Sequence, residues 1–221
     1  MSVVEVVTPS YNKGKYISDA IQSVLSQTFK DWHYTIIENS TDDSTRAIID
    51  SFKDPRITVI HEDVPDELRR SEYIPAVLLN RYMPELKGDY FAYLSDDDIF
   101  DPACFQMCIN NMTPDRSVVY FSMNVTAERD DGSYVYVSTS NATTEWAVSQ
   151  NMDCMIDGGQ AFMRRAVLDS IPQPYFETQM TTASHCDGLF LTKVAKQFKF
   201  YPIPSVLLTH RRTKLSAWVR S

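Results

Sequence analysis

Short apolar runs rich in β-branched residues alternate with segments of helical periodicity through the first half of this 221-residue chain. The predicted strands span residues 3–8, 33–38, 56–61 and 89–94, and the predicted helices span residues 16–27, 42–52 and 71–86. This alternation predicts an α/β fold in which a mostly parallel central sheet carries helices on both faces. Ligands of such sheets bind beyond the carboxyl ends of the strands. We therefore expect functional residues where each strand ends.

The second half of the chain is less regular. Two β-rich runs, residues 117–123 and 133–139, flank an Asp-Gly pair and predict a hairpin. Four further predictions are a short helix at 145–152, a strand leading into a helix at 161–171, a helix at 187–198, and two proline-interrupted strands at 199–210. Because no linker or repeat interrupts the chain, we expect one domain. Within that domain two halves are expected, about 1–100 and about 101–221.

Composition excludes several classes of partner. The formal net charge is −8, which disfavours a general binder of nucleic acid or of anionic membranes, because its far field repels phosphate. No apolar run approaches the ~20 residues of a transmembrane helix, and the N-terminal residues do not predict a signal peptide. A cytoplasmic location is therefore expected. The four cysteines form no Cys-x-x-Cys pair and are expected to be free thiols.

Three consecutive acids follow the predicted strand at 89–94, in the run Tyr-Leu-Ser-Asp-Asp-Asp-Ile-Phe at residues 93–100. Neighbouring carboxylates repel one another unless a cation lies between them, and hard oxygen ligands suit Mg²⁺ or Mn²⁺. Such a cation would also neutralise a diphosphate. A solvated acidic loop is the alternative, and the three acids alone do not exclude it.

Three motifs, two at strand ends and one at the end of the first predicted helix, form a recognisable pattern. The motifs Pro-Ser-Tyr-Asn at 9–12, Ser-Val-Leu-Ser-Gln-Thr-Phe at 23–29 and Leu-Ser-Asp-Asp-Asp at 94–98 occur in that order. Together they resemble the nucleotide-sugar-dependent glycosyltransferases of family 2, which have the GT-A fold. Within that family the chain is most similar to the short bacterial spore-coat type and to the compact transferases of large algal viruses. The resemblance is close over the first half and looser over the second. It implies that residues of about 1–100 form the nucleotide-binding half and residues of about 101–221 the acceptor-binding, catalytic half.

The resemblance implies residues that contact the nucleotide sugar, namely Thr8, Pro9, Ser10, Tyr11, Asn39, Arg69, Asp96, Asp97, Asp157 and Arg211. Tyr11 is expected to stack on the base, and Arg70 is an alternative to Arg69. Asn39 stands where the family commonly has an aspartate. An amide both donates and accepts hydrogen bonds, so the preference for uracil that is usual in the family stays open here.

The resemblance also implies the metal and the catalytic base. Ser95 replaces the first acid of the family's DxD pattern, so Asp97 is the expected principal ligand of Mn²⁺ or Mg²⁺, with His210 as a second ligand. Asp187 is the expected base, although a simple helix cap is an alternative for this position. The basic run around Arg211 is expected to close over the diphosphate.

The implied activity is the transfer of a sugar, with inversion, from a UDP-hexose to a hydroxyl group of a glycan or glycoprotein. UDP-glucose and a UDP-deoxyhexose such as rhamnose are candidate donors. Two alternatives are a non-catalytic module that binds sugar nucleotides or glycans, and a nucleotidyltransferase. The second is disfavoured because the chain has six glycines and none clustered near the first strand, where a phosphate-binding loop would lie. The sequence does not identify the sugar or the acceptor.

Overall fold

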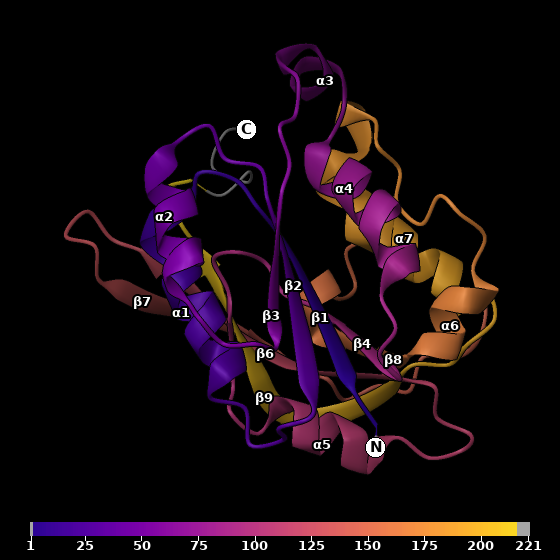
Figure 1. The fold of residues 1–221 in the computed structure, drawn as a ribbon. Coiled ribbons are helices and arrows are strands. Elements are labelled where there is room, and N and C mark those ends of the chain that lie inside the picture. The colour runs from indigo at the N-terminus through magenta and orange to yellow at the C-terminus, as the bar shows by residue number, and fades with distance from the viewer. Residues whose placement is uncertain (1, 216–221) are drawn as a thin grey trace.

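A computed structural model of the chain describes residues 2–215, and one mixed sheet organises them (Figure 1). Four parallel neighbours form its first part in the order β3-β2-β1-β4. Their bounds are β1 (Val4–Ser10), β2 (Trp32–Glu38), β3 (Ile57–His61) and β4 (Tyr90–Tyr93). The strand predictions for the first half are therefore confirmed, and the carboxyl ends of these strands meet at one edge of the sheet.

The sheet continues from β4 through β8, β6, β9 and β5. Strand β7 lies outside this order and pairs with β6. The bounds are β5 (Ile99–Phe100), β6 (Val118–Glu128), β7 (Tyr134–Ser140), β8 (Ala161–Arg164) and β9 (Tyr201–Arg212). Of these strands, only β6 and β9 pair in parallel, and the remaining pairs are antiparallel. The sheet is therefore mixed: the parallel pairing predicted for it holds throughout β1 to β4, and antiparallel pairs join most of the later strands.

Helices cover both faces of the sheet, as predicted (Figure 1). One face carries α1 (Gly14–Leu25), α2 (Asp43–Ser51) and α5 (Cys104–Asn111). The opposite face carries α4 (Ile74–Tyr82), α6 (Arg165–Ser170) and α7 (Cys186–Ala195). Successive strand residues alternate between the two cores, so that Val6 packs with α1 while Val7 packs with α4. This two-sided burial explains why the central strands are apolar throughout.

The helix predicted at 71–86 is divided in the structure. A short helix, α3 (Asp66–Ser71), precedes it, α4 begins at Ile74, and a 3-10 turn, η1 (Met83–Glu85), follows. Pro75 lies in the first turn of α4, where its missing N–H group interrupts no intrahelical hydrogen bond. The proline therefore marks the start of the helix instead of straining its middle.

Two predictions for the second half are wrong. Residues 145–152 form no helix, because Trp146 exchanges backbone hydrogen bonds of 2.9 and 3.1 Å with Phe200. Residues 199–210 do not form two strands, because β9 runs unbroken past both prolines. Shifts in the β6–β9 register opposite Pro204 accommodate the residue that cannot donate to the ladder.

The remaining predictions for the second half are confirmed. The hairpin is β6–β7, the strand that leads into a helix is β8–α6, and the helix expected at 187–198 is α7. All four cysteines are free, and Cys104 and Cys108 share the buried face of α5. Within residues 2–215, the helices are all too short or too polar to cross a membrane.

We predict that Phe162→Ala lowers the free energy of unfolding by about 3–5 kcal/mol. The ring is fully buried, stacks on Tyr90 at 5.5 Å between centroids and lies 6.4 Å from Phe105, so its removal leaves a cavity under the sheet. Urea denaturation followed by circular dichroism measures the change. The control is Tyr136→Ala, whose ring is 61% exposed and whose loss should cost no more than about 0.5 kcal/mol. Equal losses for the two variants would contradict this packing.

Candidate active site

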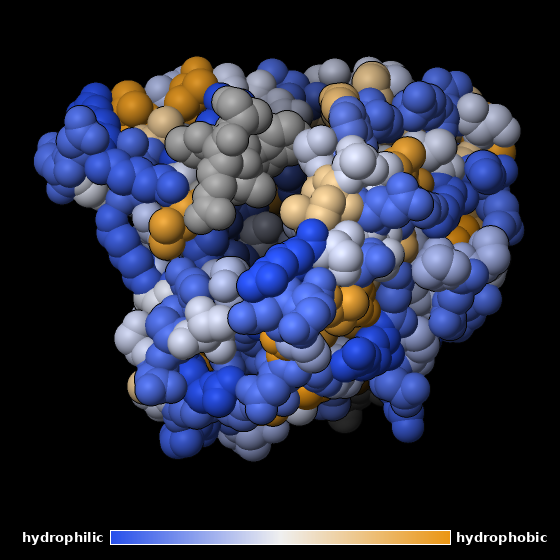
Figure 2. Space-filling model, turned by 90° about the horizontal axis from the view of Figure 1, so that it is seen from above, coloured by the Kyte–Doolittle hydropathy of each residue, from blue (hydrophilic) through white to orange (hydrophobic). Residues whose placement is uncertain are grey.

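The predicted site residues gather at the carboxyl ends of β1, β2 and β4, where the view in Figure 2 looks onto a hollow with a mostly hydrophilic rim. The turn after β1 and the acidic loop after β4 meet there. The carboxylate of Asp96 accepts a hydrogen bond of 3.1 Å from the backbone N–H of Tyr11. Desolvation, with the charge of Asp97 beside it, raises the pKa of Asp96 to about 7.

Tyr11, Asn39 and Arg69 form one connected group beside this loop. The guanidinium of Arg69 lies over the ring of Tyr11, 4.5 Å from its centroid, and donates a 2.8 Å hydrogen bond to Asn39 Oδ1. The amide of Asn39 in turn donates to the Ser10 carbonyl at 2.7 Å. An aspartate here could not make that last bond, because a carboxylate only accepts. The structure thus explains Asn39 locally: its side chain ties the end of β2 to the end of β1.

Thr8 and Pro9 belong to the interior of the sheet. The hydroxyl of Thr8 is fully buried, donates to the Leu94 carbonyl at 2.6 Å and accepts from Tyr34 at 2.9 Å. Ser10 is also buried, whereas the Tyr11 ring is 41% exposed. Of these four residues, Tyr11 is therefore the one whose side chain is open to solvent, and the contact of all four with a nucleotide stays a prediction.

Asp97 is paired with a lysine that the sequence analysis did not single out. Lys13 Nζ lies 2.5 Å from Asp97 Oδ2, and the Thr213 hydroxyl donates to the same oxygen at 3.0 Å. Lys13 comes from the turn between β1 and α1, whereas Thr213 directly follows β9. The carboxylate is 6% exposed, so this positive charge offsets much of the cost of burying it.

The surroundings of Asp97 fit a divalent cation that arrives with a diphosphate. Mg²⁺ and Mn²⁺ in such sites take one or two protein carboxylates and leave the other positions to phosphate and water. Asp97 supplies one carboxylate, and Lys13 already places positive charge against it. A cation would bind Asp97 Oδ2 in place of the lysine.

Asp98 is bound on two sides by β9. His210 Nδ1 lies 3.1 Å from Asp98 Oδ2, and the backbone N–H of Arg211 donates to Asp98 Oδ1 at 3.0 Å. Burial by itself would lower the pKa of His210, but Asp98 outweighs it and raises that pKa to about 9. A protonated imidazole has no lone pair for a metal, so His210 would ligate a cation only after losing a proton. Its place in the metal site stays a prediction.

Arg211 does not belong to a loose basic segment. Its side chain is 4% exposed, donates to the Asp97 and Tyr16 carbonyls, and forms an ion pair of 2.6 Å with Asp19. β9 extends to Arg212, so Arg211 is fixed within a strand that lies between β6 and β5. In this arrangement Arg211 holds the acidic loop through Asp97 and Asp98. Its contact with a diphosphate stays a prediction, and part of the basic segment expected to close lies outside the described residues.

Asp157 and Asp187 lie on either side of the turn at Gly158 and Gly159. Asp187 is in the first turn of α7, and its Oδ2 accepts a 3.0 Å hydrogen bond from Gly158 N–H. Asp157 caps the 3-10 turn η2 (Gly158–Gln160) through a 2.8 Å bond from Gly159 N–H. Desolvation and the charge of Asp157 raise the pKa of Asp187 to about 6. An apolar cavity lined by Tyr73, Tyr93 and Phe190 adjoins Asp187 and contributes to that desolvation.

Comparison with known proteins decides the family. Residues 5–171 match the model of glycosyl transferase family 2. The chain belongs to this family. Protein CgeD of Bacillus subtilis is 27% identical over 220 residues, which cover 95% of this chain and 50% of CgeD. The Escherichia coli glucosyltransferase WfgD, named for a UDP-Glc donor, is 31% identical over 112 residues, or 50% of this chain and 41% of WfgD.

Solved structures agree with this family 2 assignment. S. aureus TarS in complex with UDP-GlcNAc superposes with a TM-score of 0.74 at 15% identity, covering all of this chain and 61% of TarS. The mannosyltransferase PcManGT from Pyrobaculum calidifontis, in complex with GDP-Man and Mn²⁺, gives 0.65 at 16% identity, covering 97% and 59%. These likenesses show the GT-A fold. The chain spans about half the length of CgeD and less of WfgD, and the narrower likeness to spore-coat and algal-virus transferases stays a prediction.

Two contacts of the acidic loop were not predicted from the sequence. Lys13 directly follows the Pro-Ser-Tyr-Asn motif. A basic residue so soon after β1 was a signal from which its contact with the site could have been predicted. The pairing of Asp98 with His210 carried no such signal, because 112 residues separate the partners.

We predict that Lys13→Met tightens Mn²⁺ binding in the absence of nucleotide by roughly tenfold, or about 1.4 kcal/mol. The lysine competes with a cation for Asp97 Oδ2, so its removal exposes that ligand. Isothermal titration with Mn²⁺ measures the change. Lys15→Met is the matched control, because it removes the same charge two residues away, where the lysine pairs with Glu128. Weaker binding in Lys13→Met than in the control would contradict the competition.

Proposed function

We propose that this chain transfers a hexose from a UDP-sugar to a hydroxyl group of a glycan or glycoprotein, with inversion at the anomeric carbon. One observation carries the proposal: a carboxylate suited to general-base chemistry, Asp187, lies in the same electrostatic cluster as the acidic loop. Asp187 accepts a hydrogen bond from Gly158 N–H, and the next residue, Gly159, lies against the carbonyl of Tyr93 at the end of β4, where the acidic loop begins. A donor held at Asp97 would therefore present its sugar toward Asp187.

The nucleotide would bind between Tyr11, Asn39 and Arg69. Tyr11 offers an exposed ring for a base to stack on, and the Arg69 guanidinium that covers part of the ring is held by Asn39. The TarS complex with UDP-GlcNAc supports a uridine donor, whereas the PcManGT complex with GDP-Man supports a guanosine donor as the alternative. Both donor classes therefore belong in the test.

The metal would be Mn²⁺ or Mg²⁺ at Asp97. When bound there, a divalent cation would neutralise the negative charge that develops on the diphosphate as it leaves. The Mn²⁺ in the PcManGT complex supports this assignment. Asp96, whose carboxylate is held by the Tyr11 N–H, would orient the ribose or the sugar on the near side of the diphosphate.

Asp187 would take the proton of the acceptor hydroxyl as its oxygen attacks the anomeric carbon from the face opposite the leaving diphosphate. The bond from Gly158 N–H fixes the orientation of the carboxylate, and its pKa of about 6 suits proton transfer near neutral pH. Asp157, next to it, would bind the donor or acceptor sugar. The cytoplasmic location and the division into halves at about residue 100 stay predictions from the sequence.

Replacing the base tests this function. UDP-, GDP- and TDP-sugars are screened with Mn²⁺ for transfer and for donor hydrolysis. With the active donor, Asp187→Asn should lower turnover by about 100- to 10,000-fold while the donor dissociation constant stays the same. Asp169→Asn, an exposed carboxylate on α6, is the control and should keep full turnover. A binding module would bind a sugar nucleotide yet show no turnover in the unmodified chain, and that result would overturn the proposal.

The pH profile provides a second prediction. Because the folded-state pKa of Asp187 is raised to about 6, the base becomes protonated as the pH falls through that value. At saturating donor, kcat/KM for the acceptor should fall by about tenfold for each unit below pH 6. Donor dissociation constants at the same pH values separate the contribution of Asp96, whose pKa is about 7. A profile that stays flat from pH 7 to pH 5 would exclude Asp187 as the base.

A further inference from the structure

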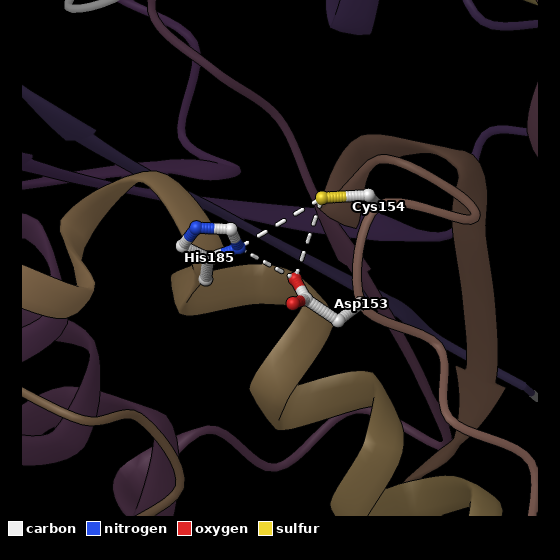
Figure 3. Close-up of side chains that lie close together, drawn as sticks. All are labelled: Asp153, Cys154 and His185. Atoms are coloured by element: carbon white, nitrogen blue, oxygen red, sulfur yellow. Dashed lines mark hydrogen bonds and ion pairs between the residues drawn. The ribbon is translucent and has the colours of Figure 1, made fainter.

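A second group of metal-ligating side chains lies outside the donor site. Asp153 and Cys154 belong to the loop between β7 and η2, and His185 ends the 3-10 turn η3 (Met180–His185) that leads into α7. Figure 3 shows the three side chains pointing toward one another from these two segments. Asp153 is half-buried, whereas Cys154 and His185 are exposed. Nothing in the proposed transfer reaction uses them.

The three ligand atoms form a compact triangle. Cys154 Sγ lies 3.6 Å from Asp153 Oδ1 and 3.8 Å from His185 Nδ1, and the nitrogen and oxygen lie 2.9 Å apart. Bond lengths to tetrahedral Zn²⁺ of about 2.3 Å for sulfur and about 2.0–2.1 Å for nitrogen and oxygen require edges of roughly 3.3–3.6 Å. Each observed edge is within about 0.4 Å of that range. Small side-chain rotations would therefore bring all three atoms to one ion.

The same geometry excludes a nucleophilic triad. In a triad, the two partners of the histidine use its two different ring nitrogens, so that one nitrogen takes a proton while the other is held. Here Cys154 and Asp153 both approach Nδ1 of His185. Desolvation and the charge of Asp153 also raise the pKa of the Cys154 thiol, which is the opposite of an activated nucleophile. Convergence on a single nitrogen is the arrangement of ligands around an ion.

The backbone holds this loop against α7. Cys154 has a φ of +59°, a left-handed conformation that turns its side chain to the same side as that of Asp153. The side chain of Met152 is fully buried, and its N–H donates to the Thr192 hydroxyl of α7 at 2.9 Å. A Cβ atom at Gly188 would lie 2.6 Å from the Cα atom of Asp153, so only glycine allows this approach. The ligands are thus positioned by packing between two segments.

We propose that Asp153 Oδ1, Cys154 Sγ and His185 Nδ1 form a Zn²⁺ site that is separate from the divalent cation at Asp97. A thiolate and an imidazole select Zn²⁺ over the harder Mg²⁺ and Mn²⁺. On binding, Cys154 releases its thiol proton to solvent, and His185 ligates through the Nδ1 lone pair while its proton stays on Nε2. The exposed side of the site leaves the fourth position to water. The ion would join the loop to the end of α7 that carries Asp187.

Direct metal binding tests the site without any sugar nucleotide. Zn²⁺ titration should show one equivalent bound, and Co²⁺ should give a thiolate-to-metal charge-transfer band in the near ultraviolet. Cys154→Ser, His185→Ala and Asp153→Asn should each weaken Zn²⁺ binding by about tenfold or more. Affinity should rise with pH because the thiol must lose a proton. Excess Mg²⁺ should not displace the ion.

Two controls distinguish this site from Zn²⁺ binding elsewhere on the chain. His61→Ala should leave Zn²⁺ affinity unchanged, because that histidine contacts two carboxylates through its two different nitrogens at 3.2 Å each. Asp97→Ala should also leave it unchanged, whatever becomes of the proposed transferase activity. Thermal melts without metal confirm that each variant folds. Loss of binding in Cys154→Ser alone, with His185→Ala and Asp153→Asn unaffected, would overturn the three-ligand site, as would binding lost in Asp97→Ala or no binding at all.

Discussion

Each of the three consecutive carboxylates after β4 has its own set of partners, and the rest of the site depends on this separation. Asp96 is held by the turn after β1, Asp97 by Lys13 and Thr213, and Asp98 by His210 and the backbone of Arg211. The partners come from both ends of the chain. Each carboxylate is therefore stabilised by its own cation or N–H group, and this offsets the repulsion among the three negative charges that the sequence alone suggests.

The partners of the acidic loop determine which of its carboxylates can bind a ligand. Asp98 is 1% exposed and is bound to β9, so it cannot turn toward a ligand without breaking both bonds. Asp97 meets the flexible end of a lysine side chain, which a cation can replace. The loop therefore offers one carboxylate for exchange and keeps another as its anchor. Arg211, which donates to the Asp97 carbonyl from within β9, supports that division.

The first half of the fold could be predicted from the sequence because its signals are local. Buried parallel strands are apolar throughout, and helices of period 3.6 separate them, so periodicity alone identifies β1 to β4 and their ligand-bearing edge. The second half depends on contacts that periodicity does not report. Trp146 forms a bridge with Phe200, and Pro204 lies in a strand that shifts register to accept it. Neither pairing can be predicted from the residues next to it in the sequence.

The site residues, like the strands, could be predicted only where the sequence near them carries a signal. The acidic run was found by its position after a predicted strand, and Tyr11 and Asn39 were named through the family resemblance. The pairing of Asp98 with His210 joins residues 112 apart, so neither signal indicated it. Arg211 was assigned to a ligand on the basis of its charge, and only the structure shows that this charge is paired with Asp19 and with backbone carbonyls. The group of Asp153, Cys154 and His185 was not predicted for a further reason. The side chains of the adjacent residues Asp153 and Cys154 converge because Cys154 adopts a left-handed backbone conformation, which the sequence does not indicate.

The position of β9 has a consequence for the order in which the protein is made. This last described strand inserts between β6 and β5, and it carries both side-chain and backbone partners of Asp98. A ribosome that has released the first hundred residues has delivered the strands of the nucleotide-binding edge, yet the acidic loop still lacks the strand that fixes it. The nascent chain therefore acquires a complete acidic loop only once residue 213 has left the exit tunnel.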